Sequence, residues 1–271
     1  MKKLVRLAHV SDVHTLEKRR RFDLDVRFVS FGRELDAALR MRKLAAALDV
    51  AKRACADHIV ISGDLTETGT QEQFETFAET LHGSGHDPDS ITLVPGNHDA
   101  YASSDAWTRA LDGPLRPWAL GAAREPGKIV EHDTAFLVPI DVSHHQSIAR
   151  SSGVVRDEVA AALERRLEDP ALARKPILFV QHHPPYAHER SWMQWIDGLR
   201  GWSRIFDLLA GHAHTHLLHG HLHRVVDRIA NIGNARIFGA PAVVDDERSA
   251  PRVRLYELRS GELESLGLAG I

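Results

Sequence analysis

The sequence has only one cysteine, Cys55, in 271 residues, and it has no long hydrophobic run. A single cysteine excludes an internal disulfide framework and fits a reducing compartment, so we expect a cytoplasmic protein. No stretch approaches the roughly 18 apolar residues of a membrane-spanning helix. The apolar segment at residues 4–10 is interrupted by Arg6 and His9 and is too short for a signal peptide, so we interpret it as a buried strand.

The sequence also lacks an excess of charge of either sign. The net charge is −3, from 34 basic and 37 acidic residues. Nucleic-acid and membrane surfaces are bound by basic protein surfaces, so this composition argues against both partners. Neither an internal repeat nor a low-complexity tract nor a linker interrupts the chain. We therefore predict one α/β domain over residues 1–271.

Strand and helix patterns alternate along the chain. The first half predicts strands at 4–10, 58–62 and 91–94, with helices at 35–56 and 71–82 between them. This βαβαβ order predicts parallel strands joined by right-handed crossovers. The second half predicts paired strands at 128–132 and 135–140, helices at 155–167 and 203–210, and strands at 176–181, 215–219, 236–238 and 252–258.

Residues able to bind metals follow five of the predicted strands. In chain order they are Asp12 and His14, then Asp64, then Asn97, His98 and Asp99, then His182 and His183, and finally His221 and His223. Binding sites in open α/β sheets lie beyond the carboxyl ends of the strands, so these side chains should converge. Carboxylate, imidazole and amide groups without thiolate suit Mn, Fe, Zn, Co or Ni.

Two local patterns support this site. Asp12 and His14 are two residues apart, as are His221 and His223, and an extended chain would direct both members of a pair to one face. Glycine precedes three of the predicted ligand positions, where the missing Cβ allows a close approach of the backbone to the site; these glycines are Gly63, Gly96 and Gly220.

The pattern Gly-His-x-His occurs twice, at residues 211–214 and 220–223. The first copy follows the predicted helix at 203–210, where Gly211 fits a helix C-terminal glycine. Only the second copy lies at the carboxyl end of the predicted strand 215–219. We therefore predict His221 and His223 as ligands. We expect His212 and His214 to face solvent, and His216 and His219 to pack in the interior.

With these motifs in order, the chain resembles the calcineurin-like metallophosphoesterases. The matching segments are "DVH", "GDLTE", "GNHD", "HHPPY" and "GHLH", between residues 12 and 223. The resemblance implies an αββα four-layer sandwich, in which two mixed β-sheets are flanked by helices. It also implies two metal ions, with Mn or Fe favoured, and a phosphoric ester hydrolysed by a hydroxide that the two metals share.

The resemblance implies a role for each site residue. One metal would be held by Asp12, His14, Asp64 and His223, and the other by Asp64, Asn97, His182 and His221, with Asp64 bridging the two. His182 is preferred to its neighbour His183 because it directly follows a strand and matches a His-x-Pro-x-Tyr spacing. His98 would act as the catalytic histidine near the phosphate, oriented by Asp99.

For the substrate, the resemblance favours a small phosphodiester of the cyclic nucleotide or glycerophosphodiester type. A phosphomonoesterase or nucleotide pyrophosphatase is the alternative. A lipid A precursor hydrolase is less favoured, because that branch carries Arg where this chain has His98. A nuclease is less favoured because only 48 residues follow His223. A non-catalytic protein-binding scaffold is disfavoured by the complete ligand set.

Specificity is expected from loops. Residues 15–34 contain the basic run Lys18–Arg21, which we interpret as a solvated face. Residues 186–202 hold three of the five tryptophans. This segment could stack on a base, form a cap or contact a second subunit, and the sequence leaves the oligomeric state open.

Overall fold

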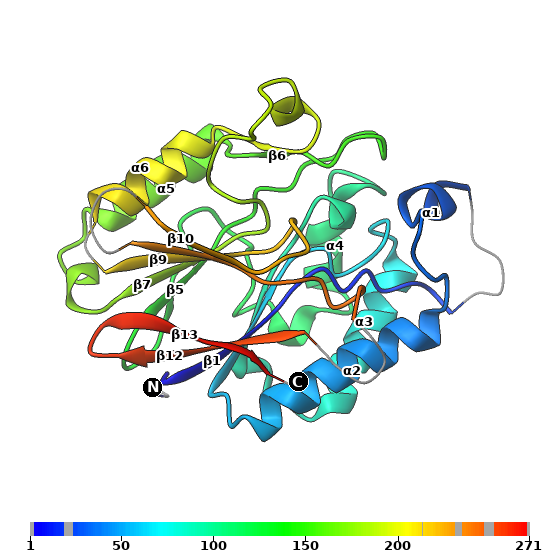
Figure 1. Cartoon of the computed structure of the whole chain (residues 1–271), viewed down its shortest axis with the longest axis horizontal. Coiled ribbons are helices and arrows are strands. Elements are labelled where there is room, and N and C mark those ends of the chain that lie inside the picture. The colour runs from blue at the N-terminus through cyan, green and yellow to red at the C-terminus, as the bar shows by residue number, and fades with distance from the viewer. Residues whose placement is uncertain (1–2, 19–23, 213, 231–234, 247–251, 270–271) are drawn as a thin grey trace.

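Two β-sheets pack face to face in the computed structural model, with helices on both outer faces (Figure 1). The structure describes residues 3–18, 24–212, 214–230, 235–246 and 252–269. One apolar cluster fills the space between the sheets and contains Val60 and Leu178. A second cluster lies between the first sheet and its helices, and a third lies between the second sheet and its helices. The order of layers is therefore helix, sheet, sheet, helix, and the predicted αββα fold is confirmed.

The first sheet has the strand order β13-β12-β1-β2-β3. Its strands are β1 (Arg6–Val10), β2 (His58–Ser62), β3 (Ile91–Val94), β12 (Val253–Arg259) and β13 (Glu262–Ala269). β1, β2 and β3 are mutually parallel, as the βαβαβ pattern predicts, and β12 joins β1 antiparallel. The carboxyl ends of the three parallel strands consequently lie at one edge of this sheet.

The second sheet has the strand order β10-β11-β9-β7-β5-β4. Its strands are β4 (Val130–Glu131), β5 (Phe136–Pro139), β7 (Ile177–Val180), β9 (Thr215–His219), β10 (Val226–Ile229) and β11 (Arg236–Gly239). The four central strands are parallel, and the edge strands β4 and β10 are antiparallel to their neighbours. A small parallel pair joins β6 (Gly153–Val154) to β8 (Leu199–Arg200).

Helices cover both sheets through buried apolar faces. The longer ones are α2 (Ala37–Arg53), α3 (Gln71–Ser84), α4 (Ala106–Asp112), α5 (Asp157–Leu167) and α6 (Trp202–Gly211). α2 begins at Asp36, whose carboxylate accepts a hydrogen bond from the amide of Leu39 (2.9 Å). α3 ends at Gly85, which adopts a left-handed conformation (φ 68°) that glycine reaches at little cost. The first three pack on the first sheet and the last two on the second (Figure 1).

Several elements, most of them short, were not predicted from the sequence. They are α1 (Leu24–Val29), the strands β6, β8, β10 and β13, and the 3-10 turns η1 (Pro88–Ser90), η2 (His98–Ala100), η3 (Arg116–Trp118), η4 (Leu172–Arg174) and η5 (Met193–Trp195). Of the basic run, Lys18 is described and pairs with Glu79, whereas residues 19–21 lie outside the described residues. None of the described helices is long and apolar enough to cross a membrane.

Candidate metal centre

The five predicted motifs meet at the carboxyl edge of the two sheets. Backbone hydrogen bonds tie the first motif to the second: the amide of Asp12 donates to the carbonyl of Gly63 (3.1 Å), and the amide of His14 donates to that of Asp64 (2.9 Å). The amide of Gly220 likewise donates to the carbonyl of His182 (3.0 Å). These backbone hydrogen bonds alone hold the loops that follow the strands in fixed positions relative to one another.

Asp64 lies at the centre of this convergence. Its Oδ2 atom is 3.2 Å from Nε2 of His182 and 3.7 Å from Nε2 of His14. Its Oδ1 atom accepts a hydrogen bond from the amide of His98 (2.9 Å), which holds the carboxylate in place. Asp64 thus lies between residues that were predicted for two different metals.

Asp12 lies beside Asp64 and faces two further predicted ligands. Its Oδ1 atom is 3.3 Å from Nε2 of His223 and 4.0 Å from Nε2 of His182. Potential ligand atoms of Asp12, His14 and His223 all fall within 4.8 Å of one another, and so do those of Asp12, Asp64 and His182. These two groups share Asp12, and together they contain five of the seven predicted ligands.

Several buried atoms of these residues have no hydrogen-bond partner. They are Asp12 Oδ1, His14 Nε2, His182 Nε2 and Asn97 Oδ1. Burying such atoms unpaired costs free energy, and coordination to a cation would compensate for that cost. The atoms left unpaired are lone-pair acceptors of carboxylate, imidazole and amide groups, so the residues fit the metal site that the sequence predicts.

Neighbouring groups direct the lone pairs of two ligands inward. His182 donates its Nδ1 hydrogen to the carbonyl of Ser62 (2.8 Å), so Nε2 is the atom that faces Asp64 and that offers its lone pair to a cation once its proton has left. The amide nitrogen of Asn97 donates to the hydroxyl of Tyr101 (2.9 Å), and this hydroxyl donates to the carbonyl of Arg150 (2.7 Å). The side-chain oxygen of Asn97 remains free to bind a cation.

The backbone at the site is strained rather than extended. Eight non-glycine residues in the described ranges have a positive φ, and five of them are Asp12 (54°), His14 (52°), Asp64 (50°), His221 (66°) and His223 (52°). The prediction that an extended chain aligns Asp12 with His14, and His221 with His223, is therefore wrong. Left-handed turns aim these side chains instead. Such strain is found where function requires a particular side-chain direction.

The three glycines that precede predicted ligands lie very close to neighbouring side chains, most of them predicted ligands. A Cβ at Gly96 would overlap Oδ1 of Asp64, and one at Gly220 would overlap the hydroxyl of Ser11 and lie 2.7 Å from Oδ2 of Asp12. A Cβ at Gly63 would lie 2.5 Å from Nδ1 of His182. Glycine thus permits close packing against the ligand side chains.

His221 lies at the rim of the site. It donates its Nε2 hydrogen to the carbonyl of Asp197 (2.8 Å), and the Asp197 carboxylate is 3.2 Å from the same atom. The ring centre of His221 is 5.3 Å from that of His182. Among the described residues, His221 belongs to none of the groups whose ligand atoms lie within 4.8 Å. Its Nδ1 is the atom left for a metal, and Asp197 positions the ring.

His183 points away from the centre. It is fully buried and donates its Nε2 hydrogen to the carbonyl of Ser151 (2.7 Å), and its ring lies 4.2 Å from that of His221. Burial and the nearby His221 hold its pKa well below the ordinary value, so the ring is neutral. This geometry favours His182 over His183 as a ligand.

His98 lies over the centre, but Asp99 does not orient it. Nδ1 of His98 donates to the carbonyl of Glu67 (2.7 Å), which turns Nε2 toward Oδ2 of Asp64 (4.0 Å). The Asp99 carboxylate accepts hydrogen bonds from the backbone amides of Leu65, Thr66 and Gly96, and from the Thr66 hydroxyl. The expected pairing is therefore wrong, and Asp99 braces two ligand loops.

Glu67 is a residue whose role the sequence did not reveal, although it is the last letter of "GDLTE". Its buried carboxylate forms ion pairs with Arg40 and with Arg33 (3.6 Å) and lies 3.6 Å from Nδ1 of His14. Two guanidinium groups neutralise this carboxylate, which favours an orienting role behind His14. Asp245 plays the same part at His223, where its Oδ2 lies 2.8 Å from Nδ1.

Charges within the site shift several pKa values. Burial alone would raise the pKa of Asp64, but the histidines around it, His182 first, hold it well below its ordinary value. Burial would lower the pKa values of His182 and His223, yet the facing aspartates raise them to about 9 and about 10. Burial and the Asp64 carboxylate raise the pKa of Asp99 to about 7. Without metal, ionised aspartates and protonated histidines thus face one another at this edge.

The first Gly-His-x-His copy lies at the other end of β9. Gly211 is the last residue of α6 and is not left-handed, so it differs from the C-terminal glycine that we predicted. His212 follows the helix, and its Nδ1 donates to the carbonyl of Leu208 (2.9 Å). His214 is 54% exposed, as expected, and pairs with Glu262 (3.5 Å). Of the histidines predicted to pack inside, His216 and His219 are both buried.

Known proteins share both the sequence pattern and the fold. A profile described as calcineurin-like phosphoesterase matches residues 5–225. A dimetal phosphatase from Danio rerio superposes with a TM-score of 0.66 at 12% identity, covering 100% of this chain and 98% of that one. The protein TT1561 of Thermus thermophilus gives 0.60 at 14% identity, with 98% and 99% covered. Fold and profile define a metal-dependent phosphoesterase.

The chain belongs to the calcineurin-like phosphoesterase family, which confirms the resemblance read from its motifs. It is 26% identical to a probable cyclic nucleotide phosphodiesterase of Rhodopseudomonas palustris, over 76% of this chain and 71% of the relative. A probable cyclic nucleotide phosphodiesterase of Rhodococcus erythropolis is 24% identical, over 80% and 64%. A glycerophosphodiester phosphodiesterase of Enterobacter lignolyticus is 32% identical over 48% of this chain and 42% of its own length.

Proposed function

We propose that this protein hydrolyses a small phosphodiester of the cyclic nucleotide or glycerophosphodiester type, using two metal ions. The position of Asp64 carries the proposal, because its Oδ2 atom lies 3.7 Å from His14 and 3.2 Å from His182. One carboxylate between two imidazoles is what a bridging ligand requires. The relatives named as cyclic nucleotide and glycerophosphodiester phosphodiesterases support the choice of a diester.

The ligand assignment is the one that the family resemblance implies, and it is supported by the unpaired buried atoms of Asp12, His14, Asn97 and His182. One ion would be held by Asp12, His14, Asp64 and His223, and the second by Asp64, Asn97, His182 and His221. Ions bound there would supply an activated water and neutralise charge on the phosphate. Oxygen and imidazole ligands without thiolate fit Mn or Fe, and Zn, Co and Ni are compatible with the same set.

The chain's own groups would do the remaining work. His98, fixed by the Glu67 carbonyl, would direct Nε2 toward the place where the phosphate would lie. In the imidazolium form, with both ring nitrogens protonated, it would donate the Nε2 proton to the departing oxygen. Asp99 holds the loops that carry Asp64 and Asn97. Glu67, Asp197 and Asp245 orient three of the histidines and hold them in position.

A substrate panel tests the proposal. Metal-free protein would be reloaded separately with Mn, Fe, Zn, Co or Ni and assayed with diesters, cyclic nucleotides, monoesters and pyrophosphates. We expect the highest kcat/KM with a diester and loss of turnover on chelation. Faster turnover of monoesters or of nucleotide pyrophosphates would replace the diester assignment with a phosphatase or pyrophosphatase. Hydrolysis of none of them with any metal would contradict the enzyme assignment.

A further inference from the structure

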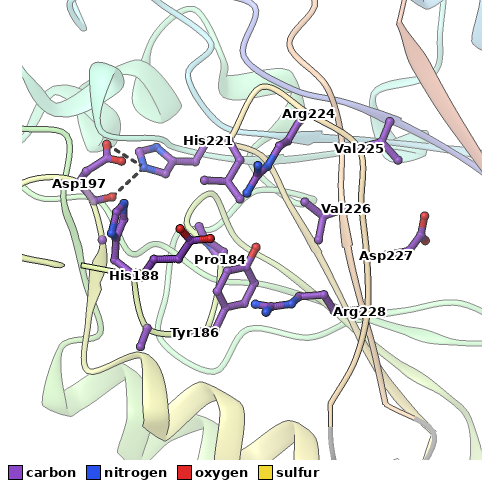
Figure 2. A pocket seen from close by; sticks show the side chains of 14 residues that line it. Pro184, Tyr186, His188, Asp197, His221, Arg224, Val225, Val226, Asp227 and Arg228 are labelled. Carbon is purple, nitrogen blue, oxygen red and sulfur yellow. Dashed lines mark hydrogen bonds and ion pairs between the residues drawn. The ribbon is translucent and has the colours of Figure 1, made fainter. Parts of the chain in front are cut away.

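A pocket of about 540 Å³ opens directly beside the proposed metal centre (Figure 2). His221 and Asp197 form part of its wall, so the pocket begins where the proposed ligands end. Its other walls include Tyr186, Arg224 and Arg228. This volume accommodates a small-molecule group rather than a polymer, and a group bound at the metals could extend into it.

The walls of the pocket continue two of the metal motifs. Tyr186 is the last residue of "HHPPY", four residues after His182, and Arg224 directly follows His223. Arg228 lies on the edge strand β10, where it shares a face with Val226 because alternate residues point the same way. The pocket residues are therefore held at a fixed distance from the proposed metals.

The guanidinium groups of this pocket are not neutralised by its carboxylates. Asp227 is paired with Arg254, and Asp197 with His221 and Ser151. Among the described residues, no carboxylate lies within ion-pair distance of Arg224 or Arg228. Glu189 is the remaining acidic group of the lining, and it is exposed. The lining therefore contains three carboxylates, but none of them pairs with Arg224 or Arg228, and both guanidinium groups keep their donors free for a ligand.

Tyr186 fixes the orientation of one of these cations. The guanidinium carbon of Arg228 lies 4.2 Å from the centre of the Tyr186 ring, and Figure 2 shows this side chain directed toward the ring. Burial raises the pKa of the Tyr186 hydroxyl, while Arg228 and Arg224 oppose the rise, so both cations act on this ring. A guanidinium placed over an aromatic ring keeps donors at its edge available for a bidentate oxyanion.

We propose that one ester arm of the substrate enters this pocket and ends in an anionic group, a phosphate or a carboxylate, which Arg224 and Arg228 bind. This inference rests on the proposed phosphodiesterase function and narrows its substrate class to diesters with an anionic arm. It excludes simple cyclic nucleotides, whose only anionic group is the diester itself. A diester with an uncharged arm would reach the same metals but would leave both guanidinium groups without a partner.

Three synthetic diesters test the inference. All three carry p-nitrophenolate as the leaving group, and their second arms are propyl, 3-carboxypropyl and 3-phosphonooxypropyl. We expect at least one charged arm to raise kcat/KM roughly tenfold or more over propyl, since charge-assisted hydrogen bonds contribute on that scale. The better charged arm identifies carboxylate or phosphate as the preferred group. Equal kcat/KM for all three diesters would overturn the inference.

Variants locate the effect. The double variant Arg224→Gln/Arg228→Gln should lose the preference for a charged arm, so that its kcat/KM values for the three diesters become equal. Arg190→Gln is the matched control, because Arg190 is exposed on the same loop as Tyr186 and does not line the pocket. A charged-arm preference that survives in the double variant, or disappears in the control, would contradict the assignment to these two arginines.

Direct binding separates this inference from the proposed function. Calorimetry would compare propane-1,3-bisphosphonate with propylphosphonate on the metal-loaded protein. We expect the bisphosphonate to bind roughly tenfold tighter to the native protein and to lose this advantage in the double variant. If no diester is hydrolysed but this pattern holds, the proposed function fails and the anion site stands. Equal affinities of the two ligands would overturn the anion site even in an active enzyme.

Discussion

Nδ1 of His98 lies 2.7 Å from the carbonyl oxygen of Glu67, so the histidine that we propose as catalytic is fixed by the backbone and not by its neighbour Asp99. A carbonyl can only accept, so the Nδ1 hydrogen is committed to it, and Nε2 is the atom available to the substrate. The hydrogen bond at Nδ1 therefore decides which ring nitrogen, Nε2, can take part in catalysis.

Replacement of His98 should slow the reaction most for poor leaving groups. His98→Ala should retain both metals and lose about 10²–10⁴ in kcat for basic alkoxides, because proton donation matters most there. The loss should be small for nitrophenolate. The measurement is kcat for diesters that span a range of leaving-group pKa, together with metal content. A loss that does not vary with the leaving group would favour electrostatic stabilisation, and loss of a metal would make His98 a ligand.

Asp99→Asn should act through the loops instead. An amide cannot accept all of the hydrogen bonds that the carboxylate receives, and a buried unpaired donor costs about 1–3 kcal/mol. Because the pKa of Asp99 is raised to about 7, the comparison belongs at pH 8, where the native side chain is ionised. We expect a lower free energy of unfolding and weaker metal binding, with an unchanged dependence on the leaving group. A steeper dependence of kcat on the leaving-group pKa in Asp99→Asn would show that Asp99 acts through His98.

The two Gly-His-x-His copies should differ sharply. His221→Ala and His223→Ala should each weaken metal binding by about 10-fold or more, the range found even for groups that only support a ligand. The double variant His212→Ala/His214→Ala should bind metal normally, since these residues lie at the start of β9, away from the site. Metal titrations of the three variants test this. Metal loss in the double variant, with retention in the single ones, would reverse the assignment.

Metal uptake should release protons. Without metal, the facing aspartates raise the pKa values of His182 and His223 to about 9 and about 10, so both rings are protonated at pH 7. Coordination requires neutral imidazole, so we expect release of about two protons and an affinity that falls as the pH falls. Calorimetry in buffers of different ionisation enthalpy measures the release. His223→Gln should release about one proton fewer, and pH-independent affinity in the native protein would contradict the assignment.

The sequence predicted the fold well where its signal was local. Buried strands such as residues 58–62 and 91–94 were predicted at their observed bounds, since each is a short apolar run ending in glycine or polar residues. The edge strand β10 was missed because it is exposed and lacks such a run. The pocket that β10 helps to form was missed with it.

The site was predictable in composition but not in geometry. Ordered motifs at strand ends identified Asp64 and His182, whereas backbone torsions gave no sequence signal, and the positive φ of Asp12 and His14 was not anticipated. Partners such as Asp245 come from distant parts of the chain and meet their histidines only in the folded protein. Proximity in sequence wrongly paired Asp99 with His98, because adjacent side chains in a turn point in different directions.

The metal content and activity of Asp64→Asn test the central claim most directly. Asp64 is assigned to both ions, so this change should reduce the metal content below two per chain. It should also lower kcat by at least about 100-fold, since even groups that only support ligands contribute 10–100-fold. Asp141→Asn is the control, because that carboxylate pairs with Arg156 outside the site. Two bound metals with native turnover in Asp64→Asn would contradict the account.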